Sequence, residues 1–576
     1  MIVEKDNKWI WDIAFTVIGC TVGVFLLWKC RYGYANMDEV FYLLTPYRLC
    51  QGDALFAGEW HLSQMSAFLL YPVMKIYLML GGGFERICLN FRYIYTIIHT
   101  LVSAFVYIRL RPVCRTGAAA SCLTLLLYAP FGIMALSYNS MGIDFLTASL
   151  VIMCTAKRGK RAQEILAGFL FAAAVLCCPY LIAAFVIYLI ACIVVPILRK
   201  KYGAEPDPVF NIKSWIFYTI GAVILAFIFA AFVFSRASLE QILASMPHIL
   251  NDTAHESKGF FTMIITYFGS VLKLSKAADL CYALLLALAV LALIDKKSKD
   301  RAHMYIAAAT VFTVVAIVFM VWYGTYINFV MYPITLMAPV CAAVNRSGSA
   351  KKLFFGFWIP GMLYTFCIHA SSNMEYYAIS SAAAVAVVPS MMIIAISARD
   401  FMRSRRDAAG YAAVVIAVIL SVGQILTVGY MRYRTVFWGS MDDLIETEEK
   451  EGIEKGLFIS PEAKKQQDMA DEAAAYIEEI MPGEGNLLVM STQNSLYLQC
   501  PDKKNASISG WIMELDGTIS RNTCDRLLAY YEINPQKIPD IIYVYKDYAE
   551  YIEDLNTVAD YEIVKEDWGA LILVRK

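Results

Sequence analysis

The chain has 576 residues, of which 59% are hydrophobic and only 17% are charged. Soluble domains average about half apolar and about a quarter charged residues, so this composition excludes an ordinary soluble protein and a disordered chain. The remaining class is a helical membrane protein with many spans. The overall net charge is zero, yet residues 1–436 carry +15 and residues 437–576 carry −15. The acidic tail argues against nucleic-acid binding, which needs a positive surface.

Apolar runs long enough to cross a bilayer predict an all-α polytopic membrane domain, 1–436, with about 13 transmembrane helices. The predicted spans are 10–28, 88–108, 117–137, 141–156, 163–177, 180–197, 214–234, 278–294, 304–323, 326–344, 353–370, 378–398 and 409–430.

Lys and Arg gather in every second loop, for example at 109–115 and 296–301. The positive-inside rule then predicts a cytoplasmic N-terminus in a protein of the plasma membrane. With 13 spans the tail would lie outside the cell, and one span more or fewer would reverse that sidedness.

Two regions lie outside the predicted spans. The first outer loop, 31–87, contains an apolar stretch at 66–80 that is interrupted by Pro72 and Lys75. Counting this stretch as a span breaks the charge alternation, so we expect an interfacial helix. The tail, 437–576, predicts a small extracytoplasmic α/β domain without a glycine-rich phosphate loop. Its expected elements are helices 462–480 and 525–531 and strands 487–490, 541–545, 561–565 and 570–574.

The acidic pair Asp38-Glu39 stands just outside the first span, at the start of a predicted helix, 40–50. A carboxylate held at the membrane surface can act as a general base toward an acceptor hydroxyl. The same residues also fit a structural interpretation, in which Asn36 caps the helix and Glu39 completes a capping box. The two interpretations are compatible, because a base must be held rigidly.

Arg92, His99 and Ser103 share one face of the second predicted span. Ionisable groups inside a membrane are costly and commonly line a functional cavity. Arg92 could therefore bind a phosphate through two parallel N–H groups of its planar guanidinium. The alternative is that Arg92 snorkels to the interface and His99 is a hydrogen-bonded core residue.

Other polar residues carry weaker hypotheses. Arg48 and Lys75 in the first loop would add positive charge near a lipid phosphate, although Lys75 also fits snorkelling. Tyr138 and Asn139 fill a short turn on the predicted outer side and would line a cavity there. His255 lies in a second long loop whose spacing of candidate ligands matches no specific metal site. No metal is required, although a divalent cation is compatible with this chemistry.

A series of short motifs follows the first predicted span: Asn36-Met37-Asp38-Glu39, Tyr42, Arg48-Leu49-Cys50-Gln51-Gly52-Asp53, Tyr71-Pro72, Phe84-Glu85-Arg86 and Arg92. With these motifs, about residues 1–430 resemble the GT-C superfamily of polytopic glycosyltransferases, in particular the protein O-mannosyltransferase and lipid A aminoarabinose transferase group. The Lys-Pro-Pro motif of the aminoarabinose enzymes is absent, which leaves Lys75 as a loose match.

The resemblance implies transfer of a sugar, with inversion, from a polyprenyl-phosphate donor to an acceptor hydroxyl. Asp38 would be the base with Glu39 in support, and Arg92, Lys75 and Arg48 would contact the phosphate. The acceptor, whether lipid, glycan or protein, is not identified by any motif. A lipid-linked-sugar flippase or other polytopic transporter is the main alternative, but the polar features gather on one side of the membrane rather than at its midplane.

Overall fold

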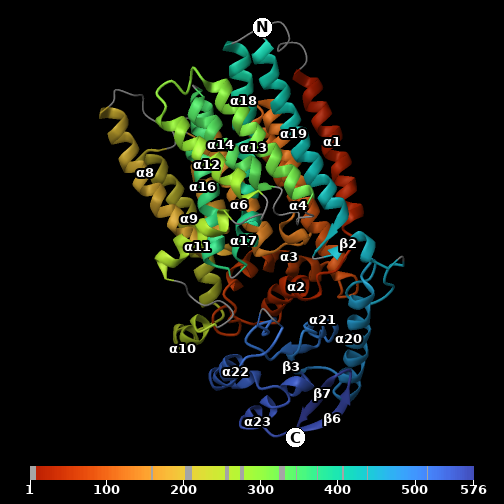
Figure 1. Cartoon of the computed structure of the whole chain (residues 1–576). Helices are drawn as coiled ribbons and strands as arrows, with labels where there is room; N and C mark the ends of the chain where they lie inside the picture. The colour runs from red at the N-terminus through yellow and green to blue at the C-terminus, as the bar shows by residue number, and fades with distance from the viewer. Residues whose placement is uncertain are drawn as a thin grey trace.

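The computed structural model describes residues 8–156, 160–201, 210–252, 259–272, 278–322, 331–345, 347–372, 374–404, 408–437, 439–445, 447–514 and 517–576. The chain forms a bundle of long helices with a smaller α/β domain at one end (Figure 1). The polytopic fold with a C-terminal α/β domain is therefore confirmed.

Eight described helices are long and apolar enough to cross a membrane, and four shorter ones are also apolar. The helices of the bundle are α1 (Lys8–Lys29), α4 (Ile87–Leu110), α5 (Arg115–Leu127), α6 (Tyr138–Thr155), α7 (Arg161–Cys177), α8 (Ile182–Lys201), α9 (Ile212–Phe234), α11 (Phe260–Leu272), α12 (Asp279–Ile294), α13 (Ala302–Trp322), α14 (Tyr332–Val344), α15 (Gly348–Leu353), α16 (Ile359–Ala370), α17 (Glu375–Ala382), α18 (Ala384–Ser404) and α19 (Ala408–Arg434). Helix α10 (Leu239–Leu250) follows α9 and lies below the bundle, beside the C-terminal domain (Figure 1).

Each predicted span overlaps one of these helices or a run of them, although residues 323 and 326–330 of the predicted spans lie outside the described residues. The span predicted at 117–137 is too long. Its helix, α5, ends at Leu127, and the chain continues into a short 3-10 turn that begins at Pro130. Proline disfavours a helical conformation in the residue before it, and Phe131 adopts a positive φ of 55°. This break places a run of backbone carbonyls, 127–132, beside the site described below.

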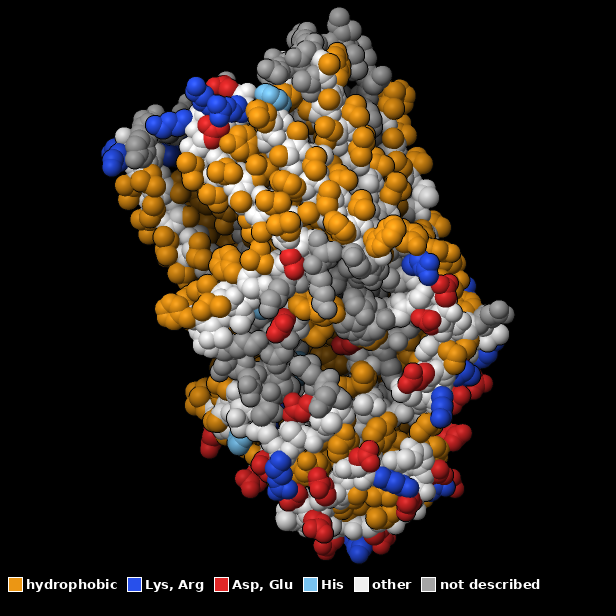
Figure 2. Space-filling view, in the orientation of Figure 1, with side chains coloured by type: hydrophobic (Ala, Val, Ile, Leu, Met, Phe, Trp, Pro, Cys, Tyr) orange, Lys and Arg blue, Asp and Glu red, His pale blue; other side chains and the backbone are white. Residues whose placement is uncertain are grey.

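Side chains sort by type along the long axis of the molecule. On the face drawn in Figure 2, an apolar belt covers the bundle, and acidic and basic side chains mix over the C-terminal domain. Large apolar side chains on several helices are more than half exposed, as at Val24 and Phe227. Such a belt is unfavourable in water and is expected of a surface that faces lipid.

The first long loop folds into two helices between the bundle and the C-terminal domain. These are α2 (Asn36–Cys50) and α3 (Ala67–Met79), so the apolar stretch predicted to be an interfacial helix is helical. Met79 and Leu80 at the end of α3 are 76% and 83% exposed, respectively. This apolar end is suited to the membrane interface.

The C-terminal domain is built on a mixed sheet of order β4-β3-β5-β7-β6. Strand β3 runs parallel to β4 and β5, whereas β7 is antiparallel to β5 and β6. Strand β4 and the short helices α21 and α23 were not predicted from the sequence. The elements are α20 (Pro461–Ile480), β3 (Gly485–Met490), α21 (Leu496–Gln499), β4 (Lys503–Asn505), α22 (Arg521–Ile533), β5 (Ile541–Tyr545), α23 (Tyr551–Leu555), β6 (Tyr561–Asp567) and β7 (Ala570–Arg575), preceded by the hairpin β1 (Thr435–Val436) and β2 (Gly439–Ser440).

A connecting segment, 445–459, fixes this domain to the bundle. Its backbone exchanges hydrogen bonds with the end of α1, where the Gly33 N–H donates to the Phe458 carbonyl over 2.8 Å. It also accepts from the start of α4, where the Arg86 N–H donates to the Gly452 carbonyl over 2.9 Å. Backbone pairing at two separate places restrains the domain against rotation, so groups from both parts can form one site.

Candidate functional site

The acidic pair lies in the first turn of α2. The N-cap of this helix is Ala35 rather than Asn36, so the predicted capping box is wrong in its residues. Of the two hydrogen bonds of a capping box, the one from the N-cap backbone is present, since the Ala35 N–H donates to a Glu39 carboxylate oxygen over 3.1 Å. Asp38 and Glu39 point in different directions around the helix, since consecutive residues are about 100° apart.

Glu39 forms a buried ion pair with Arg92 of α4. The guanidinium Nε and Nη2 donate to the two carboxylate oxygens over 2.6 and 2.5 Å, respectively. Arg92 also donates to the carbonyls of Cys30 and Gly33, and its residue is only 5% exposed. The snorkelling interpretation of Arg92 is therefore wrong, because the side chain points into the protein and joins α1, α2 and α4.

Asp38 faces a different environment from Glu39. The Tyr42 hydroxyl donates to its carboxylate over 3.5 Å, and the Tyr42 ring packs edge-on against Tyr138, with 5.8 Å between centroids. Burial and, to a lesser extent, the neighbouring Glu39 together raise the pKa of Asp38 to about 6, against the lowering effect of the Tyr42 hydrogen bond. A carboxyl group with a pKa near 6 is ionised at neutral pH and basic enough to accept a proton.

The C-terminal domain reaches the same turn of α2. The Asn494 side-chain nitrogen donates to the Met37 carbonyl over 3.0 Å. Trp511 packs against the aromatic cluster that includes Phe41 and Tyr42. Asn494 follows strand β3 and Trp511 follows strand β4, so both stand near the carboxyl ends of parallel strands, where α/β domains bind ligands. Neither residue was predicted from the sequence, although the polar run that follows β3 could have indicated Asn494.

A narrow cation-rich cleft lies on the Glu39 side of the turn. Lys29, Arg92 and Arg432 line it together with a single carboxylate, that of Glu39. Lys29 ends α1, Arg92 lies near the start of α4 and Arg432 lies near the end of α19, so three helices supply the cations of this cleft.

The cations of this cleft are held by backbone carbonyls. Arg432 donates to the carbonyls of Leu127, Ala129 and Gly132 over 3.1 to 3.3 Å, and Lys29 donates to the Tyr433 carbonyl over 2.9 Å. Within the described part of the chain, neither side chain forms an ion pair. Formal charges in the cleft therefore sum to +2, and buried charge of one sign is costly unless an anion compensates it.

Lys29 and Arg432 were not among the residues singled out from the sequence. Both follow predicted spans on the outer side of the membrane, where the positive-inside rule disfavours Lys and Arg. Their unusual position in the sequence could have singled them out. Their convergence depends on three helices that are far apart in the sequence.

His99 and Ser103 are buried in α4 but do not reach this site. His99 Nδ1 lies 2.9 Å from an Asp144 carboxylate oxygen, and Nε2 lies 2.8 Å from the Leu125 carbonyl. Both ring nitrogens are therefore occupied by hydrogen-bond partners within the protein. The pair joins α4 to α6, as expected of a hydrogen-bonded core histidine.

The other predicted site residues are dispersed. Arg48 is fully buried and is occupied by Asp53 and Glu59, each at 2.8 Å, which is a structural arrangement remote from the cleft. Lys75 is exposed on α3 and donates to the Tyr71 hydroxyl over 3.1 Å. Tyr138 lies beside Tyr42, with Asn139 next to it in the first turn of α6. His255 lies outside the described residues.

No cluster of His, Cys, Asp and Glu that could hold a metal ion is found among the described residues. The candidate site brings together the Asp38 carboxyl group, the cation-rich cleft beside it, and the surrounding side chains of Tyr42, Tyr138, Asn494 and Trp511.

Comparisons with known proteins give structural neighbours only. Neither the protein-family models nor the curated proteins include a match. The chain is similar to the crystal structure of ArnT from Cupriavidus metallidurans bound to undecaprenyl phosphate, at 13% identity and a TM-score of 0.43, over 99% of this chain and 98% of that one. The apo form of the same protein matches at 14% identity and a TM-score of 0.42, over 98% and 97%. At this identity the similarity concerns the course of the chain and not its chemistry.

Proposed function

We propose that the protein is a membrane glycosyltransferase that transfers a sugar from a polyprenyl-phosphate donor to an acceptor hydroxyl at the outer membrane surface, with inversion. The observation that carries the proposal is the junction in the first turn of α2, where Asp38 and the cation-rich cleft lie on either side of a single turn. Displacement at a sugar phosphate needs a base for the attacking hydroxyl and positive charge for the departing phosphate. Here both groups adjoin one helical turn.

The cleft suits the phosphate of the donor. Lys29 and Arg432 supply the uncompensated positive charge, and Arg92 is held in place by Glu39. Polyprenyl phosphate leaves as an anion, so fixed cations stabilise the charge that develops in the transition state. The cleft is closed to about 10 Å³, roughly the space of one water molecule, so its wall must open for a phosphate to enter.

Asp38 is the base in this proposal. The acceptor hydroxyl gives its proton to the Asp38 carboxylate, and its oxygen forms a bond to the anomeric carbon. The bond between that carbon and the phosphate oxygen breaks on the opposite face, and the electron pair leaves with polyprenyl phosphate. Tyr42 donates a hydrogen bond to the carboxylate, and Tyr138 packs against the Tyr42 ring. Asn494 and Trp511 close the site from the C-terminal domain.

The membrane setting is consistent with this chemistry. A lipid-linked donor brings its phosphate to the interface, and the three cations lie at the ends of apolar helices. The donor supplies the driving force, so the transfer needs no nucleotide site. The ArnT structure to which this chain is similar holds undecaprenyl phosphate, which is the class of ligand proposed here.

Native mass spectrometry of the purified protein with its co-purified lipids tests the proposal. We expect wild-type protein to retain polyprenyl phosphate, and Asp38→Asn to accumulate intact polyprenyl-phosphate sugar, because the donor binds but the acceptor is not activated. Glu479→Gln is the matched control, since Glu479 is an exposed carboxylate on α20. Only bulk phospholipid in both the wild type and the Asp38→Asn variant would contradict the donor site.

The cleft is tested by Lys29→Met, which keeps the length of the side chain and removes its charge. We expect about tenfold less retained polyprenyl phosphate, as for loss of one charge-assisted contact. Lys296→Met, at an exposed lysine after α12, is the control. Equal retention by the two variants would exclude Lys29 from the site. Normal transfer by Asp38→Asn would instead favour a flippase.

A further inference from the structure

A second cavity lies about 20 Å along α2 from Asp38, judged from 1.5 Å of helix rise per residue. It has a volume of about 470 Å³ and lies between the end of α2, the junction of α9 with α10 and the C-terminal domain. Small-molecule sites commonly measure about 300–1,000 Å³ and occur at domain interfaces. The proposed transfer reaction does not use this cavity.

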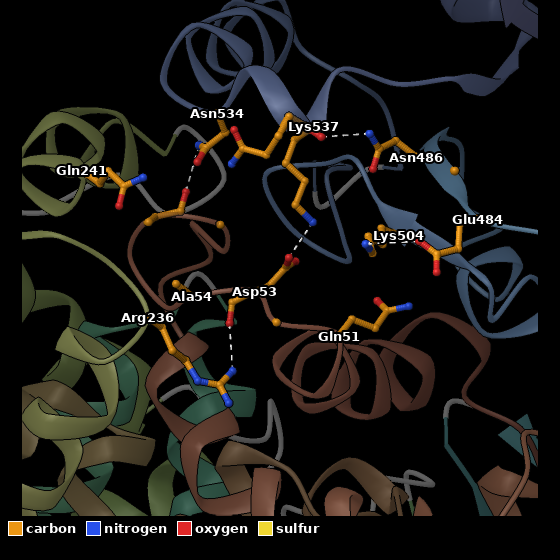
Figure 3. Close-up of a pocket in the computed structure, with 15 residues that line it drawn as sticks. Gln51, Asp53, Ala54, Arg236, Gln241, Glu484, Asn486, Lys504, Asn534 and Lys537 are labelled. Carbon is orange, nitrogen blue, oxygen red and sulfur yellow. Dashed lines mark hydrogen bonds and ion pairs between the residues drawn. The ribbon is translucent and has the colours of Figure 1, made fainter.

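The floor of the cavity is an ion network that joins the two domains. Figure 3 shows Lys537 reaching from the C-terminal domain to Asp53, and Arg236 approaching Asp53 from the bundle. Lys537 Nζ lies 2.5 Å from an Asp53 carboxylate oxygen, and the Arg236 Nη1 donates to the Asp53 carbonyl over 3.1 Å. These contacts hold the residues that form the floor of the cavity in defined positions.

The walls of the cavity are rich in carboxamides, and the side-chain nitrogens of three of them already donate to backbone carbonyls. The Gln51 nitrogen donates to the carbonyls of Pro501 and Lys503, and the Asn486 nitrogen to those of Gln536 and Ile538. The Asn534 nitrogen likewise donates to the Ala57 carbonyl over 3.2 Å. The amide oxygens of these side chains have no hydrogen-bond partner among the described residues, so they remain as acceptors for ligand hydroxyls.

The charge of the lining is positive by one. Arg236, Lys504 and Lys537 outnumber Asp53 and Glu484. Lys504 is half exposed and lies 3.7 Å from Glu484, which is a loose surface pair. Arg236 stacks over the rings of Tyr71 and Phe232 at the end of α9, with its guanidinium 4.8 and 4.3 Å from their centroids. The cavity therefore offers cations for one anionic group beside acceptors for hydroxyls.

We propose that this cavity binds a saccharide unit that carries one negative charge. Amide oxygens suit sugar hydroxyls, and Lys504 with Arg236 suits a carboxylate or phosphate on the sugar. The binding site stands by itself, whereas its assignment to the distal part of an extended acceptor rests on the proposed function. Such an acceptor would lie along α2, with its reacting hydroxyl at Asp38 and an anionic unit held here.

Saturation-transfer NMR on the full chain in phosphatidylcholine nanodiscs tests the site, with glucose 6-phosphate as the charged probe and maltose as the neutral one. We expect contact signals from glucose 6-phosphate and much weaker ones from maltose. Lys504→Glu should weaken glucose 6-phosphate binding about tenfold, and Gln536→Trp should fill the cavity and abolish binding. Lys465→Glu, an exposed lysine on α20, is the matched control.

Absence of any probe signal, equal binding of the two probes, or unchanged binding by Lys504→Glu would overturn the proposal. Displacement of glucose 6-phosphate when phosphatidylglycerol is added to the nanodiscs would identify a lipid headgroup and overturn the saccharide assignment. Binding by Asp38→Asn should equal that of the wild type. Failure of the proposed function therefore shows in the transfer and lipid-retention measurements, and failure of this site shows in the NMR signals.

Discussion

Replacing Asp38 with Asn should remove activity and at the same time stabilise the fold at neutral pH. The pKa of Asp38 is raised from 3.8 to about 6, chiefly by burial. A carboxyl group whose pKa is higher in the folded than in the unfolded state favours folding below pH 4, and this contribution is lost as the pH rises to about 6. The full shift corresponds to about 3 kcal/mol, and partial exposure of Asp38 reduces this to about 1–2 kcal/mol.

Thermal unfolding of wild-type and Asp38→Asn protein at pH 4 and pH 7.5 measures this effect. We expect the variant to be the more stable of the two at pH 7.5, and the difference to vanish at pH 4. Transfer should fall by about 10²–10⁴-fold, the usual contribution of a general base. In the wild type the rate should rise with pH up to about 6 and then level off, because the ionised carboxylate is required.

Glu479→Gln again serves as the control for loss of a carboxylate. A variant Asp38→Asn that is less stable than the wild type at pH 7.5, or a stability difference that does not change with pH, would refute the assignment of a raised pKa. Retained transfer in a folded variant would refute the role of Asp38 as base.

Three other substitutions follow from the contacts. Glu39→Gln should cost about 3–5 kcal/mol of unfolding free energy, because Arg92 stays buried without its carboxylate; a thermal transition equal to that of the wild type would contradict this. Asp53→Asn should loosen the contact with Lys537, so limited proteolysis should release the C-terminal domain faster, whereas unchanged cleavage would show that the connecting segment 445–459 alone holds it. Trp511→Ala should raise the KM for acceptor and leave donor retention unchanged, and loss of both would indicate a structural role.

Local pattern was sufficient to predict most of the helices and strands. Spans such as 88–108 and 214–234 coincide with α4 and α9, because crossing a bilayer requires about 20 apolar residues in a helix that makes all its backbone hydrogen bonds internally. The exceptions have local causes, as at Pro130, where the apolar run continues although the helix stops. Strand β4 was missed because three residues give too short a pattern for period-two alternation.

The candidate site was predictable only in part. Asp38, Glu39 and Arg92 stood out because charge beside or inside an apolar span is expensive, and that cost is visible in the sequence. The sequence could not show that Arg92 is committed to Glu39, or that Arg48 is occupied by Asp53 and Glu59. Pairing of this kind depends on which side chains meet in space.

By itself, the sequence determined the membrane class, the order of helices, the acidic α/β tail and the position of the acidic pair, because these depend on hydrophobicity and charge along the chain. Only the tertiary structure brought Lys29 and Arg432 together with Arg92, and Asn494 and Trp511 to the first turn of α2. Arg432, Asn494 and Trp511 are hundreds of residues away from Lys29, α2 and Arg92 in the sequence, and no local pattern encodes their distance in space. Their convergence follows from helix packing and from the connecting segment that holds the C-terminal domain against the bundle.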